Sequence, residues 1–599
     1  MPRFLISLAA LCLISLASAQ APKFKKVLPE TPVGFTLKTI TVAEHPEHTV
    51  ELFVYVPDAD GTYPCILDIH GGGWKSRQVE SDKPMMERLA QRGFVTALVS
   101  YRLSGEAPYP AALYDCKAAL RTLRAHADEL KIIPDRIGCM GGSAGGHLSG
   151  LVSMTTGKKE FEGNGPHQDQ SSAVKAAIVT AATQDLETAY MEKPSEGVVM
   201  FLGKPDEHPE HYRDASPITH VRKGVPPTIF IEGEKDTLKI GRAEMMAKLT
   251  ALKIETAVHT LKDAPHPFWM SQPWLDQTVE IADKFFKKHL GKPKPAAYTS
   301  VEDARAKGPD FDVQGEFTAE HDGKRWGVQV WAMGGGQFEA VGYQGGLPGD
   351  GWDLDRDTIS RTPGTWDEAL GKAVFVAENN QLSAEIGPDM AEVFNGEGTR
   401  LFELQRVHRE SPTLGAEPPD GALVLFNGSD INRFPGSTVT EEGWLKEGIL
   451  SEPKFEDFTI HIEFRLPYMP SARGQARGNS GIYLQGRYEV QMLDSFALEG
   501  VDNECGGIYK TARPNENMCF PPLSWQTYDI DFTAARFDEA GKKTANAKIT
   551  VRHNGVVIHE DLGIPEPTGG ARLKEGPQPG PIFLQNHGNP VRYRNIWVK

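Results

Sequence analysis

Residues 137–147 read Ile-Gly-Cys-Met-Gly-Gly-Ser-Ala-Gly-Gly-His, in which an apolar run leads into a Gly-x-Ser-x-Gly motif. Such a strand–turn–helix sequence needs small residues beside the serine, because the chain turns sharply and lifts the hydroxyl above the carboxyl edge of a sheet. The backbone N–H of Ala144 and the dipole of the following helix favour negative charge that develops nearby. A glycine-rich loop can also be a simple helix cap, but the strand before it and the helix after it favour a nucleophile at Ser143.

Around this motif, residues 35–290 alternate short apolar runs with amphipathic windows. The runs that predict strands are 52–56, 65–69, 95–99, 137–140, 176–179, 228–232 and 256–261. The windows that predict helices are 83–92, 111–130, 147–154, 240–252 and 277–289. This alternation predicts a mostly parallel, doubly wound sheet with helices on both faces.

A second glycine-rich segment, His70-Gly71-Gly72-Gly73-Trp74, follows the predicted strand 65–69. Consecutive glycines let backbone N–H groups point into a cleft with no side chain in the way, which an oxyanion hole requires. The alternative is a flexible loop, but the serine motif further along the chain favours the oxyanion hole. We expect Gly72, Gly73 and Ala144 to supply its N–H groups.

A serine hydroxyl needs a positioned base, and the order serine, acid, histidine is expected in such a sheet. Asp236 follows the predicted strand 228–232, and His266 lies in the loop after the strand ending at Leu261. We therefore predict Asp236 and His266 as the catalytic partners of Ser143. The rival acid is Asp263, which is more easily interpreted as a turn residue. The rival histidines are His259, inside a strand, and His289, on a helix face.

The remaining chain changes character twice. Residues 291–297, with two lysines and two prolines, predict a linker. In residues 310–409, apolar and polar residues alternate with period two, which predicts a small antiparallel β unit of unknown role. Three of its tryptophans, Trp326, Trp331 and Trp352, form its core or a sugar-stacking surface. Residues 410–420 predict a second linker, and 421–599 carry short strands and turns typical of a sandwich or jelly roll.

Composition narrows the function. The 599 residues include 64 Lys and Arg against 80 Asp and Glu, a net charge of −16, and no basic block, which argues against nucleic-acid binding. The apolar run 4–16 followed by Ala17-Ser18-Ala19 predicts a signal peptide, residues 1–19, cleaved after Ala19. No later stretch predicts a membrane span. We expect a secreted or periplasmic protein, in which Cys505 and Cys519 are either a disulfide or free thiols.

The segments 70–74, Ser100-Tyr-Arg-Leu, Asp135-Arg-Ile and 141–147 resemble the α/β-hydrolase group of bacterial feruloyl and acetyl-xylan esterases, related to hormone-sensitive lipase. The resemblance covers residues 35–290 and implies ester hydrolysis on plant or algal polysaccharide. No large lid insertion is evident. Trp74, Tyr109 and Trp269 are candidates for a sugar or aryl site, or are packing residues.

The segments Leu425-Phe-Asn-Gly-Ser-Asp, Asn479-Ser-Gly-Ile-Tyr-Leu, 488–494 and 580–587 with 594–596 resemble the 3-keto-disaccharide hydrolase domain. This resemblance covers residues 419–599 and implies a concanavalin-like jelly roll that cleaves 3-keto-glycosides. In a strand over 488–493, Glu489 and Gln491 share one face, and Gln585 and His587 share a face in a second strand. With Asp494 these residues form a candidate site, in which Glu489, Asp494 or His587 is the base; the alternative is a solvated outer face.

The sequence therefore predicts a multidomain secreted serine esterase that removes acetyl or feruloyl groups from polysaccharide. It needs no metal and no organic cofactor for this reaction, and its partner is a poly- or oligosaccharide substrate. Its C-terminal domain acts on glycan or binds it. The alternatives are a 3-keto-glycoside hydrolase with an accessory esterase, or a serine peptidase, and the oligomeric state stays open.

Overall fold

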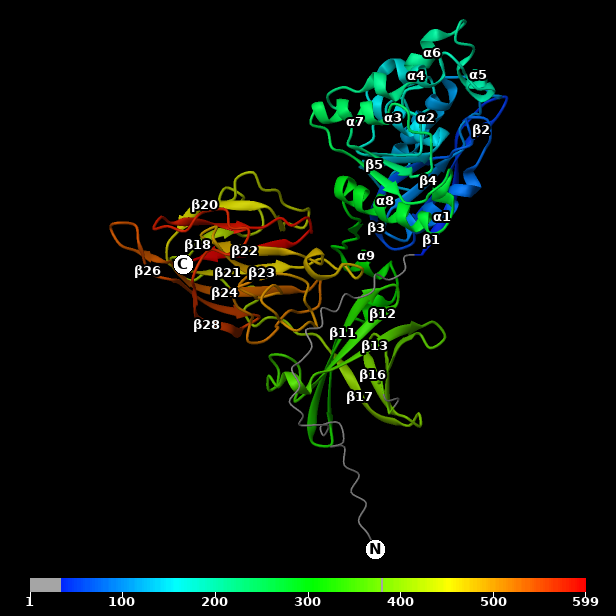
Figure 1. The fold of residues 1–599 in the computed structure, drawn as a ribbon. Coiled ribbons are helices and arrows are strands. Elements are labelled where there is room, and N and C mark those ends of the chain that lie inside the picture. The colour runs from blue at the N-terminus through cyan, green and yellow to red at the C-terminus, as the bar shows by residue number, and fades with distance from the viewer. Residues whose placement is uncertain (1–33, 379–380) are drawn as a thin grey trace.

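Three folded bodies follow one another along the chain (Figure 1). The computed structural model describes residues 34–378 and 381–599. The predicted signal peptide, residues 1–19, lies outside the described residues. Within the described part of the chain, no helix is long and apolar enough to cross a membrane.

The first body is built on a mixed sheet in which β1, β2 and β4 pair antiparallel and the strands from β4 onward pair parallel. The strand order is β1-β2-β4-β3-β5-β6-β7-β8, with β9 added antiparallel to β3. The strands are β1 (Phe35–Glu44), β2 (Thr49–Pro57), β3 (Gly61–Ile69), β4 (Val95–Val99), β5 (Ile132–Gly142), β6 (Ala177–Thr180), β7 (Thr228–Gly233), β8 (Thr256–Leu261) and β9 (Lys294–Pro295).

Helices cover both faces of this sheet, which confirms the predicted doubly wound fold (Figure 1). The helices of this body are α1 (Val79–Ala90), α2 (Ala111–Ala125), α3 (Ala144–Met154), α4 (Leu186–Tyr190), α5 (Glu196–Leu202), α6 (Pro209–Asp214), α7 (Arg242–Ala251) and α8 (Trp274–Leu290). Two short helices that follow it, α9 (Val301–Arg305) and α10 (Asp310–Val313), pack with the second body. Helices α2, α3 and α7 pack on one face, and α1 and α8 on the other. Helix α8 buries Leu275, Val279, Ala282 and Phe286, the i, i+4, i+7 spacing of an amphipathic helix.

Residues 181–227, between β6 and β7, form a cap that carries α4, α5 and α6. These helices have 5, 7 and 6 residues, too few to produce a helical period in the sequence. The sequence therefore shows no sign of this lid-like insertion, although residues of the insertion line the cavity of the candidate site described below.

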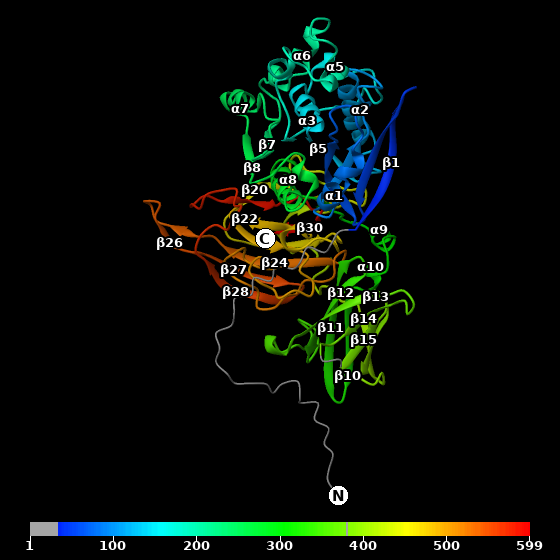
Figure 2. The same ribbon diagram turned by 45° about the vertical axis from the view of Figure 1, so that its right-hand side comes forward.

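The second body is antiparallel, as predicted, and its strands close into a barrel (Figure 2). Its strands are β10 (Gly315–His321), β11 (Lys324–Gly334), β12 (Gln337–Gln344), β13 (Ser360–Asp367), β14 (Lys372–Val376), β15 (Leu382–Ile386), β16 (Met390–Asn395) and β17 (Arg400–Val407). Residues Phe317, Val330, Phe338, Phe375 and Leu404 fill its interior. Closure depends on the pairing of β10 with β17, a long-range contact that alternation along one strand does not encode.

The third body is a jelly-roll sandwich of two antiparallel sheets. The larger has the order β18 (Leu423–Phe426), β30 (Arg592–Val598), β21 (Phe458–Arg465), β24 (Trp525–Thr533), β27 (Ala547–His553) and β28 (Val556–Ile564), with β19 (Leu445–Lys446) beside β30. The smaller has the order β20 (Ile449–Phe455), β29 (Gly580–Leu584), β22 (Ser480–Leu484) and β23 (Tyr488–Met492), and β25 (Arg536–Phe537) pairs with β26 (Lys543–Ala545). Cys505 and Cys519 are buried free thiols in this body.

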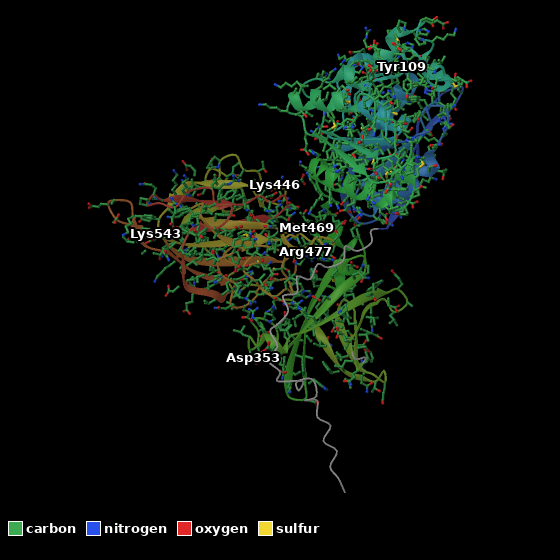
Figure 3. The ribbon with its side chains drawn as sticks, in the orientation of Figure 1. Tyr109, Asp353, Lys446, Met469, Arg477 and Lys543 are labelled. Carbon is green, nitrogen blue, oxygen red and sulfur yellow. The ribbon has the colours of Figure 1, made fainter. Side chains whose placement is uncertain are left out.

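The buried core of the jelly roll extends onto side chains of the barrel. Trp331 and Trp352 of the barrel belong to the buried cluster of the sandwich, whereas Trp326 packs inside the barrel. Arg477, at the edge of the jelly roll that faces the barrel, lies over the Trp331 ring at 5.0 Å and donates a hydrogen bond to the carbonyl of Ala332 (Figure 3). The tryptophans of the middle segment therefore serve packing, two of them between bodies.

Candidate active site

Ser143 occupies the sharp turn between β5, which ends at Gly142, and α3, which begins at Ala144. Its backbone angles are φ 56° and ψ −120°, a strained conformation for a residue with a side chain. A Cβ on either Gly141 or Gly145 would overlap the carbonyl oxygen of Ile69. The small residues of the motif are therefore required by the close approach of β3 and α3 beneath the serine.

The glycine loop after β3 presents its backbone N–H groups beside Ser143. Gly72 and Gly73 have φ of 108° and 59°, and no described residue accepts a hydrogen bond from either N–H group. Ala144 is the first residue of α3, so its N–H group has no partner within the helix. The buried His70 ring stacks on Tyr101 with centroids 4.3 Å apart, and the Tyr101 hydroxyl donates to the His70 carbonyl, which fixes the start of the loop.

His266 and Asp236 meet beyond the ends of β8 and β7. His266 Nδ1 donates to Asp236 Oδ2 at 2.8 Å, and the Leu238 N–H group donates to the other carboxylate oxygen at 2.9 Å. Burial alone would raise the pKa of Asp236, but the bonds from His266 and Leu238 outweigh it and the pKa is lowered. The carboxylate is thus ionised, and because it binds Nδ1 of the imidazole, Nε2 lies on the side of the ring away from Asp236.

The rival residues lie elsewhere. Asp263 is exposed and pairs with Lys235 at 2.9 Å. His259 is exposed on β8, and His289 packs against Phe285 on α8. None of the three contacts the pair formed by His266 and Asp236.

Trp269 fills the space between the His266 loop and the serine turn. Its ring meets the His266 ring edge-on, with centroids 5.2 Å apart and planes at 80°. A Cβ on Gly142, the residue before Ser143, would overlap the same indole. Neither Ser143 Oγ nor His266 Nε2 is hydrogen-bonded to any residue in the described ranges, so both atoms are available to a reacting group.

A cavity of about 330 Å³ opens over Ser143. Its walls include Gly73, Ala144, Trp74, Tyr190 and Val198, the last two from the cap. The glycine loop, the serine and the cap thus enclose one space.

His147 and Trp74 form a wall that sequence reasoning assigned no joint role. Trp74 Nε1 donates to His147 Nδ1 at 3.2 Å, and His147 Nε2 donates to the Ala215 carbonyl at 2.6 Å. Burial lowers the pKa of His147 to about 4, so this imidazole is neutral and holds Trp74 rather than titrating. Tyr109 lies behind this wall, against Phe201, which stacks on Trp74 (Figure 3). Of the three predicted aromatics, only Trp74 lines the cavity.

The jelly roll brings together three of its five predicted site residues. Glu489 and Gln491 lie on one face of β23, and Tyr483 is the cross-strand partner of Glu489 on β22. The Tyr483 hydroxyl donates to Glu489 Oε2 at 2.7 Å, and Gln585 Nε2 donates to that hydroxyl at 3.3 Å. Burial raises the pKa of Glu489 to about 8, against the opposing effect of the Tyr483 bond. Tyr483, absent from the predicted set, is recognisable only from strand register.

Asp494 and His587 do not join this cluster. Asp494 is buried against Arg477, with Nε and Oδ2 2.7 Å apart, at the junction with the barrel. His587 is exposed beyond β29, which ends at Leu584, so the expected strand face shared by Gln585 and His587 is wrong. After β29 the chain turns, and the Gly588 N–H group donates to Asn586 Oδ1 at 2.7 Å, so His587 lies in this turn and outside the strand.

One group of metal-ligand side chains occurs among residues 34–378 and 381–599. His208, Glu210 and His211 at α6 place three ligand atoms within 4.8 Å of one another. None of them lines the cavity over Ser143.

Two family matches divide the chain. Residues 52–245 match BD-FAE, and residues 421–599 match the 3-keto-alpha-glucoside-1,2-lyase-like domain. Among curated proteins, the chain is 32% identical over 190 residues to the probable carboxylic ester hydrolase LipM of Mycobacterium tuberculosis, covering 30% of this chain and 44% of that one. It is 32% identical over 130 residues to an arylesterase of Saccharolobus solfataricus, covering 22% and 42%. The chain thus spans less than half the length of these relatives.

Two solved structures are each similar to part of the chain. A truncated carbohydrate esterase from gut microbiota is 23% identical, with a TM-score of 0.38, and the match covers 44% of this chain and 99% of that one. A putative glycosyl hydrolase from Parabacteroides distasonis is 36% identical, with a TM-score of 0.28, over 30% and 84%. On the family matches, the chain carries an N-terminal BD-FAE α/β-hydrolase domain and a C-terminal 3-keto-α-glucoside-1,2-lyase-like domain.

Proposed function

We propose that the first domain is a serine carboxylic ester hydrolase that removes acetyl or feruloyl groups from a poly- or oligosaccharide. The observation that carries the proposal is the approach of the His266–Asp236 pair to the Ser143 turn around one indole ring. The curated relatives named as ester hydrolases support the reaction class, and the C-terminal domain supports a saccharide substrate. The signal peptide that the sequence predicts over residues 1–19 supports a secreted or periplasmic location.

The reaction needs only groups of the chain itself. Ser143 Oγ attacks the ester carbonyl while His266 Nε2 takes its proton, and Asp236 stabilises the imidazolium. The N–H groups of Gly72, Gly73 and Ala144 hold the oxyanion. When the tetrahedral intermediate collapses, the ester C–O bond breaks and the leaving sugar oxygen receives the proton from His266. Water, activated by His266, then attacks the acyl group on Ser143 and releases the acid.

Replacement of the nucleophile tests this function. Ser143→Ala removes the attacking oxygen, so we expect hydrolysis of p-nitrophenyl acetate to fall by at least about 10⁴-fold with an unchanged unfolding temperature. Turnover close to wild type would refute the assignment. Product release from acetylated and feruloylated xylan identifies the acyl group, and cleavage of an aminoacyl-anilide in preference to both would indicate a peptidase.

A second candidate function belongs to the jelly roll, where Glu489 has a raised pKa in contact with Tyr483. A 3-keto group acidifies the C2 proton of a glucoside. Ionised Glu489 takes that proton, the C2–H electrons form a C1–C2 double bond, the C1–O bond breaks with its electron pair, and the leaving oxygen takes the proton back from Glu489.

This second activity is tested in the full chain. We expect Glu489→Gln to abolish release of the aglycone from a 3-keto-glucoside and to leave ester hydrolysis intact. Because the base must be ionised, the wild-type rate should rise with pH through about 8. Retardation in a polysaccharide gel without product would instead indicate a binding module.

A further inference from the structure

Two buried carboxyl groups lie beneath the Ser143 turn and take no part in the proposed reaction. Asp68 is on β3, two residues before His70, and Asp82 is in the first turns of α1; they are 0% and 1% exposed. Among the described residues, no hydrogen-bond donor contacts either carboxyl oxygen of Asp68. Of the two oxygens of Asp82, Oδ1 accepts a hydrogen bond, from Trp269, and Oδ2 does not. Buried carboxyls are ordinarily paired with several donors or a cation, so this arrangement calls for an explanation.

The two carboxyls are close enough for each to change the pKa of the other. Burial raises the pKa of Asp82 to about 7, and burial together with the neighbouring Asp82 raises the pKa of Asp68 well above its ordinary range. At neutral pH Asp68 is therefore a neutral acid that donates to Asp82. A buried carboxyl pair of this kind costs folding free energy, and apolar residues of similar volume often serve stability better.

The pair does supply a fixed acceptor for Trp269. The indole Nε1–H donates to Asp82 Oδ1 at 3.2 Å, and Trp269 is only 2% exposed. This is the one hydrogen bond that an indole can donate, so it fixes the direction of the Nε1 edge of the ring within its apolar surroundings.

The same ring also contacts the residues that support both reacting groups, and its Nε1 edge is the one at the serine turn. It lies against Gly142, directly before Ser143, and meets the His266 ring edge-on at 5.2 Å. A rotation of the indole would therefore change the separation between the serine hydroxyl and the imidazole.

We propose that Asp82, backed by Asp68, is a positioning residue for the ester hydrolysis, which acts through Trp269 to set the approach of His266 to Ser143. The inference rests on the proposed function of the first domain. The geometry fits the role because the three links, from carboxyl to indole, from indole to serine turn and from indole to imidazole, are all direct contacts. Displacement of a reacting group by about 1 Å costs up to about 10²-fold in rate.

Three variants of the full chain test the proposal with p-nitrophenyl acetate. Asp82→Leu removes the acceptor, and Trp269→Phe removes the donor but keeps an aromatic ring. We expect each to lower kcat by about 10- to 100-fold with KM unchanged. Asp82→Asn keeps an acceptor for Trp269 and a donor for Asp68, and should stay within about threefold of wild type.

The double variant, Asp82→Leu with Trp269→Phe, separates positioning from general damage. If both changes break one link, the double variant has the same kcat as either single variant. Trp274→Phe is the matched control, because it removes another indole donor, to the Lys262 carbonyl at 3.0 Å, in the same region. We expect its kcat to equal that of wild type.

The proposal is overturned if the two losses multiply, if Asp82→Leu keeps wild-type kcat, or if its loss only follows the amount of folded protein. It is also overturned if Trp274→Phe loses as much as Trp269→Phe. Failure of the underlying function is distinguishable, since Ser143→Ala would then stay active; an inactive Ser143→Ala with a fully active Asp82→Leu would remove the positioning role alone.

Discussion

Asp236 in the hydrolase domain and Glu489 in the jelly roll are equally buried, at 4% and 2% exposure, yet they titrate in opposite directions. Asp236 accepts from an imidazole and from a backbone N–H group, and its pKa is lowered. Glu489 accepts from one neutral hydroxyl, and burial raises its pKa to about 8. Burial raises the pKa of both carboxyls; at Asp236 the imidazole and the backbone N–H group outweigh it, and at Glu489 a single hydroxyl does not.

The difference assigns different chemistry to the two sites. A carboxylate that stays ionised can orient a histidine but is a poor proton acceptor. A carboxyl that titrates near neutrality can take and return a proton itself. In the two proposed functions, the domains therefore use different bases: an imidazole aligned by a carboxylate, and a carboxyl whose pKa is raised by burial.

The largest expected effect is on the hydrolase side of this comparison. Asp236→Asn removes the charge that fixes the His266 tautomer, so we expect ester hydrolysis to fall by about 10⁴-fold. Asp263→Asn is the matched control, because that exposed carboxylate pairs with Lys235 and does not touch His266. Initial rates with p-nitrophenyl acetate measure both, and a loss in Asp263→Asn equal to that in Asp236→Asn would contradict the assignment.

On the jelly-roll side, Asp494 offers a third buried carboxyl with a different partner. It faces the guanidinium of Arg477, and Asp494→Asn leaves that cation buried and unpaired. We expect the unfolding free energy of the jelly roll to fall by about 3–5 kcal/mol. Hydrogen exchange of β22 and β23 in denaturant measures this loss, with Glu489→Gln as the control that does not break an ion pair. Unchanged protection would mean that the Arg477 bond contributes nothing.

Glu489 itself should make stability depend on pH. Its folded pKa of about 8 exceeds its unfolded value near 4.3, so the folded state binds the extra proton between these values. The unfolding free energy therefore decreases as pH rises from about 4 to about 8, by a few kcal/mol at most. Glu489→Gln should flatten this dependence in exchange measurements on β23, and an equally steep decrease in the variant would show that another group is responsible.

The serine turn was predictable because its signal is local. The sequence around Ser143 specifies strand, turn and helix within eleven residues, and chain order then limits the choice of acid and histidine. Tyr483, His147, Asp82 and Trp269 carry no such signal, because their roles depend on strand register or on packing between elements far apart in sequence. The same reason explains the unpredicted barrel closure and the short cap helices.

A segment predicted as a linker, residues 410–420, is in fact fastened to the larger sheet of the jelly roll. Thr413 Oγ1 donates to Asp529 at 2.7 Å, and the Gly415 N–H group donates to Glu463 at 2.6 Å. Between these carboxylates lies the buried His461, whose Nδ1 is 2.6 Å from Asp529 Oδ1. Composition alone gives the segment a linker's appearance, since prolines and glycines serve a packed strap equally well.

The smallest expected effect is at this strap. The pKa of the buried His461 is raised, whereas burial lowers the pKa of His147. Burial would lower the pKa of His461, but Asp529 and Glu463 outweigh it and the pKa is raised. Its contribution to stability is therefore complete below about pH 6.5 and is lost as pH rises through the folded value. We expect exchange of the Gly415 amide to accelerate over that rise, by the equivalent of about 1 kcal/mol, and His461→Gln to remove the dependence.

The matched control is His559→Gln, because burial lowers the pKa of His559 and leaves it neutral over the whole range. If the acceleration persists in His461→Gln but disappears in His559→Gln, the prediction is wrong and His559 is responsible for the pH dependence.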